Sequence, residues 1–496
     1  MATSCFSAKR PNVLFLLADD QSWPHASAYG HAATRTPTFD RIAKEGALFT
    51  RAYTSCPSCT PSRSAILTGR PFWQLGEAGV LYGAMPPSLK LFPHLLADAG
   101  YHAGFTGKSW LPGDWRAAGL KRHPCGKEYN AALLQPAPGP ALDPRDAAGN
   151  FVAFLKERPA GAPFCFWFGS TEPHRAYEQG SGLRAGQKLE QARVPGWLPD
   201  TPEIRGDLAD YFAEIEQFDR QTAQILQALE QTGELDNTLV IITSDNGMPF
   251  PRAKTNLYEA GVHMPLAIRW GARGRPGMNL DEFVSHTDLA PTILEAAGIP
   301  RPAEMTGRSL VPLIEGKRDA TRDQVFFGIE RHVMARPAGA GYPMRGMRAE
   351  RYLYIRNYEP DRWPTGGDFV SSNRTPHGDV DAGPALDYVL AHAKTLPRAE
   401  ALCLGKRPAE ELYQVETDPD QLTNLSTDPS HQNIKEKMRG RLNAYLRFTK
   451  DPRAEGRDPW RDYPYRQTDG FGASFNTTLS AEARESARSR PRHKPQ

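Results

Sequence analysis

Two pairs of oxygen-bearing side chains directly follow apolar segments that are far apart in the sequence. Asp19 and Asp20 come after the run NVLFLLA, and Asp245 and Asn246 come after TLVIITS. Adjacent carboxylates repel each other unless a cation or solvent lies between them. Oxygen donors are the preferred ligands of hard divalent cations. Taken together, the two pairs predict a site for a hard divalent cation such as Ca²⁺ or Mg²⁺.

A cysteine-rich stretch, SCPSCTPSRSAILTGR, supplies a second set of reactive side chains. Cys56 and Cys59 have the C-x-x-C spacing that occurs in zinc and redox sites. No second cysteine pair and no properly spaced histidine pair completes a zinc site, and the surroundings are not thioredoxin-like. A zinc or redox role is therefore disfavoured. Pro61 suits the start of a helix, so Cys59 would lie at a helix N-terminus, where exposed N–H groups favour an anion.

From Cys59 onwards, CTPSRSAILTGR resembles the type I sulfatase signature C-x-P-S-R-x-x-x-L-T-G-R at every fixed position. The resemblance covers most of the chain in order, through LLADDQ, TPTFDRIAKEGALFTRAYT, TGKSW, EPHR, TSDNG and ELYQVETDP. The chain is thus similar to the formylglycine-dependent sulfatases of the alkaline phosphatase superfamily. TSDNGMPFPRAKTNLYEAG and GYPMRGMR are most similar to the heparan N-sulfatase (N-sulfoglucosamine sulfohydrolase) branch.

This resemblance implies a catalytic set. A maturation enzyme would oxidise Cys59 to Cα-formylglycine, whose hydrate attacks sulfur and also binds the metal. Arg63, one helical turn further on, would hold the hydrate. Lys108 and Lys254 match sulfate-binding residues, and two cations beside a metal would neutralise an anionic substrate. His174 matches the histidine that donates a proton to the leaving group.

One position departs from the family pattern. The family reads G-K-x-H after this strand, and that histidine assists collapse of the sulfated intermediate, whereas this chain has GKSW and Trp110. An indole is not a base near neutral pH, although its N–H can donate a hydrogen bond. Three explanations stay open: slower turnover, a different substrate chemistry, or another histidine in this role, for which the candidates are His25, His31 and His123.

The family branch also suggests residues that bind substrate. Polar side chains within the similar segments, together with Trp110, are candidates to contact a sulfated saccharide: Glu172, Arg175, His332 and Arg345. Arginine suits an acidic sugar. We expect hydrolysis of a sulfate ester or sulfamate of a glycosaminoglycan-type sugar. The alternatives are a phosphodiester or phosphonate monoester hydrolase of the same superfamily and a non-catalytic saccharide-binding relative.

These residues require a scaffold that brings distant strand ends together. Short apolar runs alternate with helical patterns such as the stripe from Leu208 to Leu229, which predicts an α/β fold with a mostly parallel sheet between helices. After about residue 335 the alternation weakens, and YPMRGMRAERYLYIRNYEP alternates like an exposed antiparallel strand. We predict a catalytic domain at 10–335, a smaller α+β domain with an antiparallel sheet at 336–470, and a flexible basic tail at 471–496.

The composition limits the partners. The net charge of +3 does not indicate nucleic acid, and no apolar run approaches the ~20 residues needed to cross a membrane. A homodimer is left open, and the maturation enzyme is an expected partner. As written the chain has no signal peptide, so we expect a cytoplasmic protein. A removed leader would instead give a periplasmic, secreted or lysosome-like one.

Overall fold

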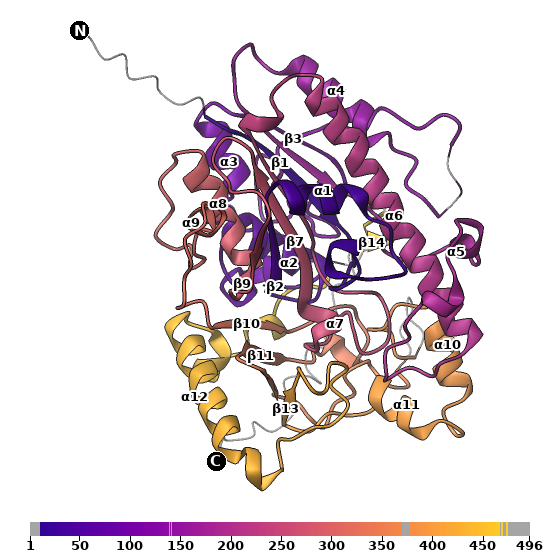
Figure 1. Ribbon diagram of the computed structural model, residues 1–496. Coiled ribbons are helices and arrows are strands. Elements are labelled where there is room, and N and C mark those ends of the chain that lie inside the picture. Colours follow the sequence, from indigo (N-terminus) through magenta and orange to yellow (C-terminus); the bar gives the residue numbers. More distant parts are fainter. Residues whose placement is uncertain are drawn as a thin grey trace.

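The described residues form two main sheets, which lie in different parts of the chain, and a third of only two short strands. The structure, a computed structural model, describes residues 10–137, 139, 141–369, 376–466, 468–469 and 473–474. Figure 1 shows the larger sheet among helices in the upper part of the view and the smaller sheet below it, beside α12. The larger sheet is mixed and nine-stranded, and the smaller is four-stranded and antiparallel. The predicted fold class is confirmed.

The large sheet is mostly parallel. Its strand order is β4-β3-β5-β1-β6-β7-β2-β8, with β9 beside β2. Only β7 runs antiparallel to its neighbours, β6 and β2, among the described strands of this sheet. The strands are β1 (Asn12–Ala18), β2 (Ala47–Tyr53), β3 (His102–Gly107), β4 (Lys127–Glu128), β5 (Phe164–Gly169), β6 (Thr238–Ser244), β7 (His263–Trp270), β8 (Met278–Leu280) and β9 (Val284–Ser285).

Strand β1 lies at the centre of this sheet and sets the position of the functional residues. It runs parallel to β5 on one side and to β6 on the other, with Ala18 paired to Ser244 and Leu17 paired to Gly169. Gly107 at the end of β3 pairs with Gly169 in turn. The carboxyl ends of these strands therefore meet at one edge, where the loops of such sheets carry ligand-binding side chains.

Three helices cover one face of the large sheet: α1 (Pro37–Glu45), α4 (Ala147–Glu157) and α6 (Pro202–Glu230). Leu14 and Leu16 of β1 pack in one core with Phe218 and Ile225 of α6. The predicted helical stripe is thus core. A proline in the first turn of α1 starts this helix at the expected Thr-Pro pair.

The other face of the sheet is covered by α2 (Cys59–Thr68), α3 (Phe92–Asp98), α8 (Leu289–Ala296) and α9 (Val311–Ile314). Val13, Phe15 and Leu17 pack against this layer. Alternate side chains of a strand point to opposite faces. Because helices cover both faces, every residue of β1 is buried, which explains its uninterrupted apolar sequence.

The smaller sheet consists of β10 (Gln324–Ile329), β11 (Met344–Ala349), β12 (Tyr352–Asn357) and β13 (Glu410–Gln414), with α12 (Gln432–Phe448) packed on it. The segment predicted as one exposed strand instead forms β11 and β12, which pair with each other. Every residue of β11 is buried. The alternation did not reveal this, because charged side chains such as Arg345 are paired inside the protein.

The smaller sheet begins earlier than the predicted second domain. Strand β10 starts at Gln324, within the range 10–335 assigned to the first domain. The domain division itself stays a prediction. Of the predicted tail at 471–496, only Ala473 and Ser474 are described, as strand β15, which pairs with β14 (Thr468–Asp469). The rest of that prediction lies outside the described residues.

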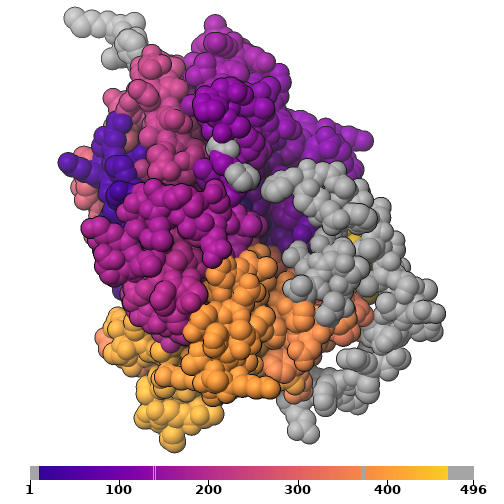
Figure 2. Space-filling view, turned by 90° about the vertical axis from the view of Figure 1, so that its right-hand side faces the viewer, coloured from indigo at the N-terminus to yellow at the C-terminus, as the bar shows by residue number. Residues whose placement is uncertain are grey.

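Four further short helices lie outside these layers. These are α5 (Ser181–Arg184), α7 (Glu259–Val262), α10 (Pro384–Ala391) and α11 (Pro397–Cys403). Helix α10 contacts α6, and Figure 2 shows the orange surface of the C-terminal half directly against the magenta surface of an earlier part of the chain. Within the described part of the chain, no helix combines the length and apolarity needed to span a bilayer.

Candidate active site

The two predicted oxygen pairs meet at the carboxyl edge of the large sheet. Asp19 and Asp20 follow β1, and Asp245 and Asn246 follow β6, so the parallel pairing of these strands brings them together. The Asp20 backbone N–H donates to Asp245 Oδ1 at 3.1 Å, and Asn246 Nδ2 donates to Asp20 Oδ1 at 2.6 Å. Asp20 has a φ of 75°, an uncommon conformation for a non-glycine residue that turns the chain sharply after the strand.

These four side chains are fully buried, and the pKa values of the three aspartates among them are shifted. Burial, together with the charge of Asp19, raises the pKa of Asp20 to about 7 against the opposing effect of Lys254. Burial and the charges of Asp19 and Asp20 raise the pKa of Asp245 to about 6, although Arg63 opposes them. Burial alone would also raise the pKa of Asp19, but Lys108, His174 and Arg63 hold it well below its usual range.

The donor set fits a divalent cation. Asn246 Oδ1 is buried without a hydrogen-bond partner among the described residues, and it belongs to a side chain whose amide nitrogen already donates to Asp20. One ligand atom each of Asp19, Cys59 and Asp245 lies within 4.8 Å of the others. Crowded carboxylates with an unsatisfied amide oxygen are what a hard cation would bind. Asp19, Asp20, Asp245 and Asn246 are therefore the residues that would hold it.

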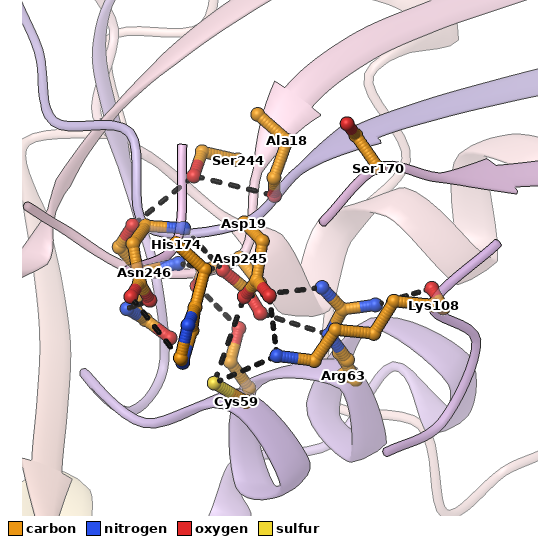
Figure 3. A network of polar contacts seen from close by, with 12 residues as sticks. Ala18, Asp19, Cys59, Arg63, Lys108, Ser170, His174, Ser244, Asp245 and Asn246 are labelled. Atoms are coloured by element: carbon orange, nitrogen blue, oxygen red, sulfur yellow. Dashed lines mark hydrogen bonds and ion pairs between the residues drawn. The ribbon is translucent and has the colours of Figure 1, made fainter. Parts of the chain in front are cut away.

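Cys59 is the first residue of helix α2 and faces this carboxylate cluster (Figure 3). Its Sγ lies 3.6 Å from Asp19 Oδ1 and 3.5 Å from Lys108 Nζ. Burial raises the pKa of the Cys59 thiol far above its usual range, although Lys108 opposes this shift. An unmodified thiol here stays protonated near neutral pH and is a weak nucleophile. The thiol itself is therefore a poor nucleophile at this site, and a stronger one requires its conversion to another functional group.

Arg63 lies one turn further along α2 and connects the helix to the strand ends. Its Nε donates to Asp245 Oδ2 at 2.8 Å, and its NH2 lies 3.4 Å from Asp19 Oδ1. Its NH1 donates to the carbonyl oxygens of Lys108 and Ser109 at 2.6 and 2.7 Å. The side chain is wholly buried. Arg63 thus fixes both the carboxylates and the loop that follows β3.

Two lysines flank the cysteine. Lys108 Nζ makes a short ion pair with Asp19, and Lys254 Nζ lies 2.7 Å from Asp20 Oδ2. Burial would lower both lysine pKa values, but the neighbouring carboxylates raise them above the usual value, so both side chains stay charged. The site thus combines fixed positive charges with a central nucleophile position, an arrangement that suits an anionic substrate.

His174 follows β5 and stands at the exposed side of the site. Its Nδ1 lies 2.5 Å from the carbonyl oxygen of Arg175, which makes Nδ1 the protonated nitrogen. Its Nε2 lies 3.8 Å from Asp20 Oδ2. Burial and the charges of Lys254 and Lys108 lower the pKa of His174 to about 4. Without a bound anion, the imidazole is therefore neutral at pH 7.

Trp110 does not face the site, which corrects its prediction as a substrate-binding residue. The ring is fully buried in the core beneath α2, and its Nε1 donates to Ser64 Oγ at 2.7 Å. Gly113 packs on it so closely that an added Cβ would lie 2.4 Å from a ring carbon. The residue in the position of the family histidine therefore holds α2 in place.

Three other predicted substrate residues are also engaged within the protein. Glu172 accepts hydrogen bonds from the Asp143 N–H and from Ser170 Oγ. Arg175 forms a two-pronged ion pair with Asp207 at 2.7 Å. Arg345 is wholly buried between Glu330 and Asp451. Their partners lie far away in the sequence or gave no motif signal, so their burial was not evident from sequence.

The four other histidines singled out in the sequence lie in two different places. His332 Nδ1 lies 2.8 Å from Oγ of Ser58, the residue before Cys59, so His332 borders the site. The three candidates to replace the family histidine pack elsewhere: His25 and His31 contact each other and Phe212, and His123 stacks on Phe105 and contacts Ser109.

Sequence reasoning missed Asp381. Its Oδ2 lies 3.2 Å from Lys254 Nζ, at the edge of the site. The segment GDVDAGP that contains Asp381 follows no predicted strand and matches no motif, so nothing in the sequence pointed to it.

Comparison with known proteins identifies the class to which this fold and site belong. The family model "Sulfatase" matches residues 11–299, and the model "N-sulphoglucosamine sulphohydrolase, C-terminal" matches residues 252–365. The chain belongs to the sulfatase family and is a sulfuric ester hydrolase. Formylglycine and a divalent metal are typical of this family.

Two relatives with stated activities are similar over most of their length. The human N-sulphoglucosamine sulphohydrolase is 31% identical, across 90% of this chain and 91% of its own. An ulvan-active sulfatase of Formosa agariphila is 28% identical, across 87% of this chain and 79% of its own.

Solved structures share the fold. One, in complex with its substrate D-glucosamine-2-N,6-O-disulfate, superposes with a TM-score of 0.65 at 20% identity, covering 91% of this chain and 100% of its own. A phosphonate monoester hydrolase of Agrobacterium radiobacter superposes with a TM-score of 0.60 at 19% identity, covering 89% and 96%. The fold alone therefore does not separate sulfate from phosphonate chemistry.

Proposed function

We propose that this sulfatase removes the N-sulfate or an O-sulfate from a glucosamine-containing saccharide of the heparan type. The observation that carries this proposal is the gathering of Lys108, Lys254 and the buried carboxylates around Cys59. The similarity to N-sulphoglucosamine sulphohydrolase, which extends into the C-terminal half, supports the choice of sugar.

The cofactors proposed are Ca²⁺, with Mg²⁺ as the alternative, and a formylglycine formed from Cys59 by a maturation enzyme. When present, the aldehyde hydrate supplies a hydroxyl nucleophile, and the cation lowers the pKa of that hydroxyl. Among the described residues, the group that could hold a metal consists of two aspartates and Cys59, and its buried oxygen ligands favour a hard cation over zinc.

The chain's own residues bind and orient the sulfo group. Lys108 is paired with Asp19, and Lys254 is paired with Asp20. Both ammonium groups would also bind the sulfo oxygens of a substrate. Arg63 fixes the positions of the Asp245 carboxylate and the Lys108 backbone by donating hydrogen bonds to both. His174 presents Nε2 toward the site while Nδ1 is held by a backbone carbonyl, so Nε2 is the atom that would carry a proton to the leaving nitrogen or oxygen. An anionic substrate would raise the low pKa of this imidazole.

An assay panel tests the function. The purified protein should hydrolyse p-nitrophenyl sulfate, and N-sulfoglucosamine or glucosamine 6-sulfate at a higher kcat/KM, with little hydrolysis of p-nitrophenyl phosphate or phosphonate esters. Peptide mass spectrometry across residues 52–63 should find Cys59 converted to formylglycine. Preferred turnover of phosphate or phosphonate esters would replace this function with the phosphonate hydrolase alternative. Saccharide binding without any turnover by fully converted protein would leave the non-catalytic alternative.

A further inference from the structure

The charged side chains of the site differ in their exposure to solvent. The exposed ones mark the opening of the site, which we call its mouth. Arg63, Lys108 and Lys254 are 0%, 6% and 4% exposed, and the metal-type carboxylates are likewise buried. By contrast, the side chain of His174 is 32% exposed, and that of Asp381 is 21% exposed. A sulfo group would bind among the buried cations. The rest of the bound substrate must then extend toward solvent past His174 and Asp381.

Asp381 is an anion in a place where the substrate is also anionic. Its carboxylate shares Lys254 with Asp20, at 3.2 Å and 2.7 Å respectively. Burial alone would raise its pKa, but Lys254, His174 and His332 hold the pKa of Asp381 well below the usual range. Apart from Lys254, no described residue donates a hydrogen bond to this carboxylate. A partly exposed carboxylate has acceptor capacity for several more hydrogen bonds.

The segment around Asp381 is fixed on both sides. On the N-terminal side, Asp379 accepts from the Val333 N–H at 3.1 Å, pairs with Arg336 at 2.7 Å, and accepts from Thr255 at its backbone carbonyl.

On the C-terminal side, Ala385 N–H donates to Asp207, which also binds Arg175. Gly383 lies against that same guanidinium, where an added Cβ would be 2.3 Å from NH1 of Arg175. Arg175, predicted to contact substrate, thus helps to hold the Asp381 segment. These anchors make the carboxylate a fixed part of the mouth, as a recognition group requires.

We propose that Asp381 is a specificity-determining residue that contacts the sugar: its carboxylate accepts a hydrogen bond from a hydroxyl or N–H group next to the bound sulfo group. The inference rests on the proposed saccharide function and adds the substrate class at the mouth, a sugar with a neutral or cationic hydrogen-bond donor beside the sulfated position. Such a carboxylate also disfavours a sugar with a second anionic group at that place.

A pair of substrates tests this role. p-Nitrophenyl sulfate has a sulfo group but no O–H or N–H donor, whereas N-sulfoglucosamine and glucosamine 6-sulfate have both. The isosteric variant Asp381→Asn should lower kcat/KM for the preferred saccharide roughly 10- to 100-fold, the range for a lost hydrogen bond to a charged group. It should change kcat/KM for p-nitrophenyl sulfate less than about threefold. Asp387→Asn, an exposed aspartate in α10, is the matched control and should change neither.

A binding measurement separates recognition from catalysis. Calorimetric titration of the same saccharide into Cys59→Ala protein should show a similar loss of affinity when Asp381→Asn is added, with an unchanged melting temperature. Equal losses on both substrates would overturn the proposal, because they are what a residue that only holds Lys254 would give. Unchanged values on both would overturn it too. If the wild type hydrolyses p-nitrophenyl sulfate but no sulfated sugar, the proposed function fails instead.

Discussion

The side chain at position 59 is the chemical centre of the site, although as a thiol it is poorly suited to that role. Its burial keeps the thiol protonated, and its neighbours are an ammonium group and the carboxylate of Asp19, whose low pKa makes it too weak a base to remove the proton. A hydrated aldehyde at this position solves the problem by offering hydroxyl groups. The role proposed for this residue therefore requires a covalent change to its side chain.

We predict that Cys59→Ala abolishes turnover, to below one part in a thousand, while preserving the fold, because the side chain supplies chemistry and little core volume. Activity assays and thermal melting measure both effects. Cys56→Ala is the matched control. Cys56 packs in the hydrophobic cluster that contains residues of the smaller sheet, so this variant should retain most of the activity. Substantial turnover by the Cys59→Ala protein would disprove the nucleophile assignment.

Helix α2 carries the proposed nucleophile and is bound to the loop that follows β3. Arg63 of the helix donates hydrogen bonds to two carbonyl oxygens of that loop, and Trp110 of the loop donates one to Ser64 of the helix. These hydrogen bonds join the loop to the helix. The indole of Trp110, at the position where the sulfatase pattern has a histidine, is fully buried in the core.

Trp110→His should accordingly destabilise the protein by roughly 3 kcal/mol, since it leaves a cavity where a buried tryptophan stood. It should not raise the rate on aryl sulfates. Denaturant unfolding and p-nitrophenyl sulfate assays measure these two quantities. Trp363→His, at a ring that is 41% exposed, should cost much less. A stable and faster Trp110→His enzyme would show that an imidazole at this position reaches the site.

Helix α6 uses acids to fix its neighbours. Asp207 accepts from α10, Asp210 from the Gly180 and Gly182 N–H groups at α5, and Asp219 from the Thr38 and Phe39 N–H groups at α1. Glu214 on the same helix is buried, and no described donor binds it. Burial and the charges of Glu172 and Asp210 raise the pKa of Glu214 to about 9.

This shift predicts a pH dependence of stability. Between the unfolded pKa of 4.5 and the folded value of about 9, the folded state binds a proton that the unfolded state releases. Stability therefore falls as pH rises through this window, by at most roughly 1.4 kcal/mol for each pH unit. Glu214→Gln should remove this slope, so that its melting temperature exceeds the wild type's by more at pH 8.5 than at pH 5. Glu190→Gln, at an exposed position, is the control. An equal difference at both pH values would contradict a neutral Glu214.

The sequence predicted the elements better than the surroundings of single side chains. β1 and β6 were evident from continuous apolar runs, and their trailing Asp and Asn residues meet because parallel strands end at one edge. Burial of charged residues was not evident. Arg345 alternates with apolar residues as an exposed arginine would, yet its partner Asp451 lies 106 positions further on. Asp381 was missed because its place depends on contacts that fix its segment from distant parts of the chain: Asp207 of α6 on one side, and Thr255 and the loop at residues 333–336 on the other.

Three buried carboxylates that would hold a cation meet at the carboxyl edge of the large sheet, so we expect the stability of the whole molecule to depend on that cation. Removing the metal with a chelator should lower turnover by several orders of magnitude, because Asp20 and Asp245 then repel each other and the nucleophile is not activated. It should also lower the melting temperature, since a ligand at 100 times its Kd stabilises the folded state by about 2.7 kcal/mol.

Re-addition experiments distinguish the cations. Ca²⁺ should restore both the melting temperature and the rate at lower concentration than Mg²⁺. Metal-free protein with an unchanged rate would contradict a metal-dependent site, and recovery only with Mg²⁺ would change the ion assigned to it.

The central position of β1 has a consequence for biosynthesis. β1 leaves the ribosome first among the described strands, but its neighbours β5 and β6 follow only after residues 164 and 238. The thiol of Cys59 is translated early and becomes enclosed only when those later segments arrive. An enzyme that modifies this thiol therefore has a limited interval during synthesis in which to act, and a chain that folds before it is reached would remain inactive.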